Sequence, residues 1–158
     1  MSTHSLAQIG VDVEAKASDA GAEVEVQAGK RNAHEQRDFF IERNGLRYAG
    51  SHLIIDLWDA DHLSDVGVIE LALRRSARAA GATLLHLHLH RFSPNGGVSG
   101  VAVLAESHIS IHTWPERGYA AVDVFTCGNT EPRNVVPVLK YAFGAGRIAI
   151  SEQLRGLV

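Results

Sequence analysis

The stretch that decides the fold is residues 83–114, TLLHLHLHRFSPNGGVSGVAVLAESHISIHTW. Apolar and polar residues alternate in Thr83–Phe92, and after the loop SPNGG the apolar pattern continues through Val98–Glu106 and His108–Trp114. Period-two alternation with turn residues between the runs is typical of consecutive β-strands. We therefore expect three neighbouring strands in this part of the chain.

Three more strands are expected on either side of this stretch. Ser51–Trp58 and Tyr119–Thr126 combine β-branched and aromatic residues, and Arg147–Glu152 supplies a last strand. Six strands with hairpin-type connections indicate an antiparallel sheet.

Two helices are expected between these strands. The first begins at a cap, Asp61 or Ser64, and runs to about Ala80, with apolar residues at helical spacing. The second covers 134–143 and begins after Thr130, an N-cap candidate. The predicted fold class is α+β, a two-layer sandwich with both helices on one face of the sheet. Few residues remain to cover the other face, so we expect a homodimer.

The charge and the apolar content of the chain indicate which classes of partner and location to expect. The whole net charge of −3 lies in residues 1–45, and this balance does not favour nucleic-acid or membrane-surface binding. There is neither a membrane-length apolar run nor a signal-peptide pattern, so we expect a cytoplasmic protein. We expect a flexible extension over 1–45, in which 22–27 could alternatively form an edge strand, and one domain over 46–158.

Three alternating histidines, His86, His88 and His90, raise the question of a metal site. On one strand face they are about 6.6 Å apart, too far to converge easily on one ion, and no cysteine or acidic residue nearby completes a set. We therefore expect no metal, and interpret them as the polar face of a strand opposite Leu85, Leu87 and Leu89.

A second group of polar residues lies within otherwise apolar strands. Burying polar groups without hydrogen-bond partners destabilises a fold, so a group this dense indicates a function or a hydrogen-bond network. Its members are Ser99, Glu106, Ser107, His108, Ser110, His112, Thr113, Glu116, Asp123 and Cys127. On a strand, Ser107 and His112 fall on opposite faces. A Ser/His hydrolase is conceivable, but the chain lacks a G-x-S-x-G elbow. The single cysteine, Cys127, could donate a proton as a neutral thiol.

The run 105–128, AESHISIHTWPERGYAAVDVFTCG, closely resembles the signature of prokaryotic S-adenosylmethionine decarboxylases. The resemblance extends from Ser51 to about Gly156. It implies a proenzyme that cleaves itself between Glu106 and Ser107 into a β chain, 1–106, and an α chain, 107–158. The cofactor it implies is a pyruvoyl group generated from Ser107, with no metal.

The resemblance also assigns roles to individual residues. Ser99 matches the processing serine, and His112 matches the histidine that removes the α-proton during processing. In turnover the pyruvoyl ketone would form a Schiff base with the substrate amine, and Cys127 matches the proton donor. Glu116 matches a substrate-binding carboxylate, and Phe92 an aromatic that can stack on adenine.

The family's activity supplies the aminopropyl donor for spermidine and other polyamines, and its active site lies between two protomers. Arg117, the loop 93–97 and the sequence before His52 depart from the family pattern. Because of these departures, an alternative remains: the same fold and chemistry acting on another amino acid, such as arginine or ornithine. A silent regulatory paralogue is a further alternative. Four residues argue against it, because a pure binding module has no need of them all: Ser99, Ser107, His112 and Cys127.

Overall fold

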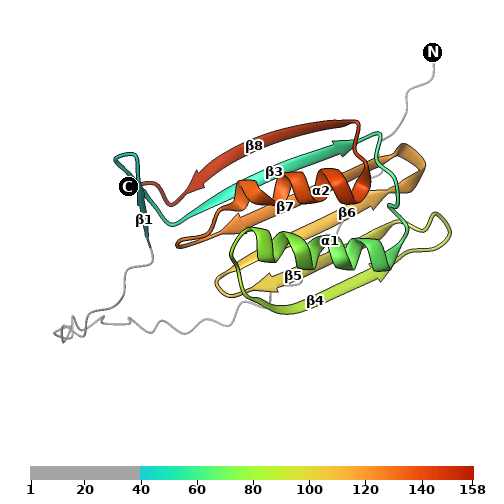
Figure 1. Ribbon diagram of the computed structural model, residues 1–158, viewed down its shortest axis with the longest axis horizontal. Helices are drawn as coiled ribbons and strands as arrows, with labels where there is room; N and C mark the ends of the chain where they lie inside the picture. Colours follow the sequence, from blue (N-terminus) through green and yellow to red (C-terminus); the bar gives the residue numbers. More distant parts are fainter. Residues whose placement is uncertain (1–39) are drawn as a thin grey trace, which may run out of the picture. The chain divides into compact units, whose positions relative to one another are not determined.

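The computed structural model describes residues 40–158, which form one six-stranded antiparallel sheet, a small hairpin and two α-helices (Figure 1). The strands of the sheet lie in the order β4-β5-β6-β7-β3-β8. Their bounds are Gly50–Trp58 (β3), Leu84–Arg91 (β4), Val98–Leu104 (β5), Ser107–Trp114 (β6), Tyr119–Thr126 (β7) and Arg147–Arg155 (β8). The helices are Val66–Ala79 (α1) and Val135–Phe143 (α2).

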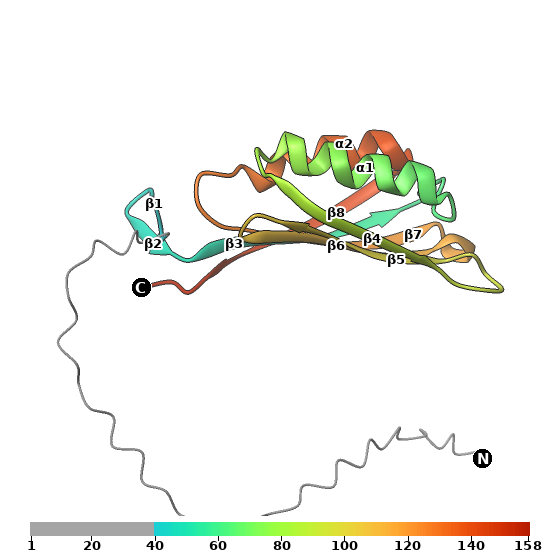
Figure 2. The ribbon, with the colours of Figure 1, turned by 90° about the horizontal axis from the view of Figure 1, so that it is seen from below.

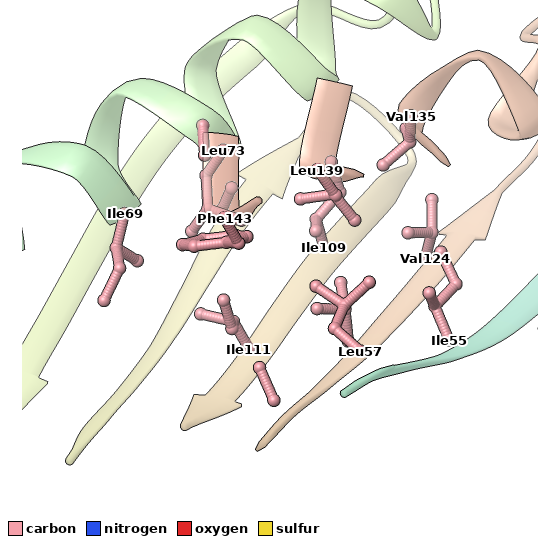
Figure 3. Close-up of a cluster of buried hydrophobic side chains, with 14 of the residues drawn as sticks. Ile55, Leu57, Ile69, Leu73, Ile109, Ile111, Val124, Val135, Leu139 and Phe143 are labelled. Carbon is pink, nitrogen blue, oxygen red and sulfur yellow. The ribbon is translucent and has the colours of Figure 1, made fainter. Parts of the chain in front are cut away.

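Both helices lie on one face of the sheet, as Figure 2 shows, so the predicted α+β two-layer arrangement is confirmed. Alternation places the side chains of Ile109 and Ile111 toward the helices, where both are fully buried. Figure 3 shows these side chains packed against Leu139 and Phe143 of α2 and against Ile69 and Leu73 of α1. The other sheet face carries half-exposed and exposed side chains.

Helix α1 begins at a different cap from the two predicted. Asp65 is the N-cap, and its Oδ1 accepts hydrogen bonds from Gly67 N at 2.9 Å and Val68 N at 3.1 Å. A carboxylate at this position also interacts favourably with the partial positive charge of the helix start. The predictions of Asp61 and Ser64 as caps are therefore wrong, although the predicted end near Ala80 is confirmed.

Helix α2 ends as predicted but starts differently. A 3-10 turn, Pro132–Asn134, precedes it, and Thr130 does not cap it, because the Thr130 hydroxyl donates to Cys127 O at 3.0 Å. Gly144 ends α2 in the left-handed region with φ of 57°. The Thr130 hydroxyl therefore stabilises the loop that follows Cys127 and does not cap α2.

The strand bounds also depart slightly from prediction. β5 ends at Leu104, because Ala105 and Glu106 form the turn that leads into β6. A bulge between Leu84 and His86 leaves Leu85 64% exposed, so Leu85 does not share the buried face of Leu87 and Leu89.

A hairpin that the sequence analysis missed precedes the sheet. Strands β1 (Ile41–Arg43) and β2 (Leu46–Tyr48) pair around the turn Asn44–Gly45, both of which have positive φ. The expected boundary between 45 and 46 falls inside this hairpin. The predictions for 1–39, including the strand at 22–27, lie outside the described residues. Among residues 40–158, no helix has the length and apolar character needed to cross a membrane.

Candidate active site

The hairpin between β5 and β6 presents Glu106 and Ser107 in an unusual geometry. Glu106 has φ of 60°, in the left-handed region, although it has a side chain that this region disfavours. Ser107 starts β6 on the helix-covered face and is 9% exposed. Its Oγ accepts a hydrogen bond from Cys127 N at 3.2 Å. A strained residue therefore lies directly before a buried, oriented hydroxyl.

Cys127 lies directly after β7, beside this hairpin. Its thiol is partly buried, and burial raises its pKa, with a further rise from the negative charge of Glu106. A raised pKa keeps the thiol protonated at neutral pH. The structure therefore brings Glu106, Ser107 and Cys127 together, and the thiol can serve as a proton donor.

Ser99 and His112 form a second group on the neighbouring strands β5 and β6. They occupy paired positions in the register, and Ser99 Oγ lies 2.9 Å from His112 Nδ1. The His112 ring is exposed and packs at 6.4 Å from the Trp114 ring. A serine hydroxyl bonded to an accessible imidazole can take up or deliver a proton.

The two groups lie far apart within one chain. Ser107 and His112 are five residues apart on β6, about 17 Å at the rise of an extended strand. They also face opposite sides of the sheet, because Ser107 is buried under the helices and His112 is exposed. The predicted alternation of faces on this strand is confirmed. One chain therefore does not bring the imidazole of His112 to Ser107.

Glu116 and Phe92 lie near the second group. Glu116 is exposed in the 3-10 turn Pro115–Arg117 that follows β6. Phe92 follows β4, is 50% exposed and packs edge-on against His90 at 4.6 Å between ring centroids. The loop after Phe92 closes on itself, because Phe92 N donates to Gly97 O and Gly96 N donates to Phe92 O. An exposed carboxylate and an exposed aromatic ring are thus available at this end of the sheet.

Other polar residues of the predicted cluster have structural partners. The Thr113 hydroxyl donates to Leu63 O at 2.7 Å, and Ser110 and His52 both contact the Asp123 carboxylate at 3.3 Å. His86, His88 and His90 are all exposed on β4. In the part of the chain that the structure describes, no group of three or more His, Cys, Asp or Glu side chains has the arrangement of a metal site.

The structure adds polar neighbours of Ser107 that the sequence analysis did not single out. Thr126, the last residue of β7, pairs with Ser51 of β3, and Ser51 Oγ donates to Glu152 Oε1 at 2.7 Å. The Glu152 pKa is lowered, first by this hydrogen bond and also by Arg133, although partial burial opposes the shift. The sequence does show a hydroxyl residue, Thr126, at the end of an apolar strand. The alignment of that strand with β6, however, is visible only in the structure.

Comparison with known proteins shows the family to which this chain belongs. The family described as S-adenosylmethionine decarboxylase matches residues 51–156. An S-adenosylmethionine decarboxylase proenzyme of Thermomicrobium roseum is 44% identical over 114 residues, which cover 72% of this chain and 98% of the relative. One from Prochlorococcus marinus is 52% identical over 106 residues, 65% of this chain and 84% of the relative.

A solved structure shows the same likeness in three dimensions. The adenosylmethionine decarboxylase of Aquifex aeolicus superimposes with a TM-score of 0.62 at 35% identity, covering 70% of this chain and 93% of that one. The hairpin Glu106–Ser107, Cys127 and the Ser99–His112 pair all lie within the matched residues 51–156. The chain belongs to the S-adenosylmethionine decarboxylase family.

Proposed function

We propose that this protein is an S-adenosylmethionine decarboxylase that is made as a proenzyme and cleaves itself between Glu106 and Ser107. The products are a chain of residues 1–106 and a chain of residues 107–158. The observation that carries the proposal is the left-handed Glu106, with φ of 60°, directly before a buried serine whose hydroxyl is held by Cys127 N. The domain is 46–158, preceded by an extension that includes β1.

Self-cleavage uses groups that this chain supplies. Ser107 Oγ attacks the Glu106 carbonyl carbon, and the amide becomes an ester as the hydroxyl proton ends on the Ser107 nitrogen. The left-handed Glu106 lowers the barrier, because relief of backbone strain accompanies cleavage. His112 of a partner protomer, oriented by the Ser99 beside it, then removes the α-proton of residue 107, and the ester oxygen leaves with the Glu106 carboxylate. Water then supplies the ketone oxygen, and the nitrogen of residue 107 leaves as ammonia.

The position of Ser107 fits the pyruvoyl group that the family resemblance implies. When formed, this group supplies a carbonyl that acts as an electron sink for loss of CO2 from the bound amino acid. Cys127 holds the proton that the decarboxylated carbon needs, since burial keeps its thiol neutral. Glu116 and Phe92 bind the substrate through its ribose hydroxyls and its adenine ring.

The distance between the two groups supports a homodimer. His112 lies about 17 Å along β6 from Ser107 and on the other sheet face, so a partner protomer must bring its own His112 to Ser107. A two-fold axis over the open sheet face places opposite ends of the two sheets together. This face exposes Ile54, Val103 and Trp114, each at least 37% accessible, which association would cover.

We place this dimer, with its small-molecule substrate, in the cytoplasm as part of polyamine synthesis.

Intact-mass measurement under denaturing conditions tests the cleavage. We expect two fragments that divide at Glu106/Ser107, and a single uncut chain for Ser107→Ala. Release of CO2 from carboxyl-labelled S-adenosylmethionine, compared with ornithine and arginine, then tests the substrate. An uncut wild-type chain, or release from ornithine or arginine in place of S-adenosylmethionine, would contradict the corresponding part of the proposal.

A further inference from the structure

Thr126 is a buried polar side chain for which the reaction described above has no use. It is 1% exposed, and its Oγ1 has no hydrogen-bond partner among residues 40–158. Hydroxyl groups buried in folded proteins nearly always have a partner. Only one other buried side chain in the described part of the protein shares this feature, Ser76 in α1.

The strand register places Thr126 between two serines. It pairs directly with Ser51 of β3. On its other side, β6 pairs with β7 through His108 and Phe125, and the next step of this register sets Ser107 opposite Thr126. Ser51, Thr126 and Ser107 are all buried on the helix-covered face. Side chains at such paired positions have Cβ atoms about 5 Å apart.

The hydrogen bonds at the two ends of this row fix its direction. Ser51 Oγ donates its hydrogen to Glu152, so its lone pairs remain to accept from Thr126. Ser107 Oγ accepts from Cys127 N, so its own hydrogen remains to be donated. Thr126 Oγ1 makes neither of the two missing hydrogen bonds in the structure. A rotation of its side chain that lets it accept from Ser107 and donate to Ser51 would complete a chain in which every hydroxyl donates toward the Glu152 carboxylate.

A small cavity lies at the end of this row that is formed by Ser51 and Thr126. Its volume is about 50 Å³, and Ser51, Thr126, Thr130 and Glu152 are among the residues that line it. This volume accommodates at least one water molecule, which needs about 10–15 Å³ by the same measure. Ser107 does not line this cavity, and Thr126 Oγ1 is closed to solvent, so the contact between Thr126 and Ser107 has to be direct.

We propose that Thr126 is a positioning residue for self-cleavage, which orients the Ser107 hydroxyl toward the Glu106 carbonyl and polarises it through Ser51 and Glu152. The inference rests on the proposed cleavage between Glu106 and Ser107. In that step the Oγ–C bond forms, the Glu106 C–N bond breaks, and the hydroxyl proton ends on the Ser107 nitrogen. Thr126 holds the hydroxyl in the attacking orientation and is itself unchanged.

The test follows the rate of cleavage after synthesis in a cell-free translation system, with the cut and uncut chains separated on denaturing gels. Thr126→Val keeps the shape of the side chain and removes the hydroxyl, and we expect cleavage about tenfold slower, the effect of one lost hydrogen bond. Thr126→Ser keeps the hydroxyl and should restore most of the rate. Ser76→Ala, the matched control, removes the other buried hydroxyl without a partner and should cleave at the wild-type rate.

A double-variant cycle separates this role from a packing effect. Because Ser51→Ala interrupts the same chain, the protein with both Thr126→Val and Ser51→Ala should cleave no more slowly than Thr126→Val alone. Thermal melting of the uncut forms, made in a Ser107→Ala background, checks that each variant folds, and Ser51→Ala tests the chain independently if Thr126→Val does not fold.

The possible failures are distinguishable. A wild-type chain that stays uncut would overturn the proposed cleavage itself. Cleavage of Thr126→Val at the wild-type rate, equal slowing by Thr126→Ser, or additive slowing in the double variant would overturn the positioning role while leaving the cleavage intact.

Discussion

The backbone N–H and the thiol of Cys127 have different roles. Its N–H holds the Ser107 hydroxyl, whereas its partly buried thiol has a raised pKa. Replacement by alanine keeps the backbone N–H and removes only the thiol. The two contributions of this residue can therefore be measured separately.

For Cys127→Ala we expect normal self-cleavage and a loss of turnover of about a hundredfold or more, the usual effect of removing a general acid. In the wild type, turnover should fall at alkaline pH as the thiol loses its proton, and the raised pKa moves this fall above the usual range for cysteine. CO2 release measured against pH checks both. Unchanged turnover in Cys127→Ala would refute the assignment.

Tyr119 provides a residue-scale test of stability. Its hydroxyl donates to Asp56 Oδ1 at 2.6 Å, and this hydrogen bond, with burial, raises the Tyr119 pKa to about 12 from 10.0. Between these pH values the unfolded chain has released the proton and the folded chain retains it. The free energy of unfolding should therefore decrease as pH rises through this interval.

Urea denaturation at neutral and alkaline pH measures this dependence. We expect Tyr119→Phe to lose less stability on the rise in pH than the wild type does. Tyr141→Phe is the matched control, because Tyr141 is 85% exposed on α2 and should leave the pH dependence unchanged. An identical alkaline loss in wild type and Tyr119→Phe would show that the hydrogen bond to Asp56 does not stabilise the fold.

At the scale of elements, the start of α1 depends on one side chain. Asp65 accepts hydrogen bonds from two N–H groups that otherwise lack a partner within the helix. Asp65→Ala should lower the free energy of unfolding by about 1 kcal/mol, whereas Asp65→Asn should retain most of it. Urea denaturation measures the loss. Ser64→Ala, at the neighbouring predicted cap, should cost less, and an equal cost would contradict the cap at Asp65.

The elements that the sequence predicted share strong periodicity. The six strands of the sheet and both helices were located because most of them repeat their apolar residues with the period of a strand or a helix. The last strand was predicted over Arg147–Glu152 and extends to Arg155 in the structure. β1 and β2 have three residues each, too few to show a period, although Asn44–Gly45 is a turn signal. The cap of α1 was misplaced because three suitable residues lie between 61 and 65, and only backbone geometry selects among them.

The candidate site was predictable as a set of residues but not as an arrangement. The signature around Glu106–Ser107 identified the residues, and alternation on β6 predicted the opposite faces of Ser107 and His112. The approach of Thr126 to Ser107 depends on how β7 aligns with β6 and β3. That alignment arises from packing of strands distant in sequence, which local patterns do not specify.

At the scale of the whole molecule, the site is divided between the two ends of the sheet. Ser107 and Cys127 lie at one end, and Ser99 and His112 lie together on β5 and β6 about 17 Å away. In a two-fold dimer each complete site takes one group from each protomer. Inactive variants with defects in different groups should then complement each other.

Co-expression of His112→Ala with Ser107→Ala tests this division. In a mixed dimer the Ser107→Ala protomer supplies an intact His112, so the His112→Ala chain should be cleaved, while the Ser107→Ala chain has no hydroxyl and stays whole. Chains distinguished by tag length and separated on denaturing gels give the readout. Ser99→Ala with His112→Ala is the control, because both defects lie in the same group and neither protomer can supply an intact Ser99–His112 pair. If the His112→Ala chain stays uncut in the first mixture, the site is not shared between protomers.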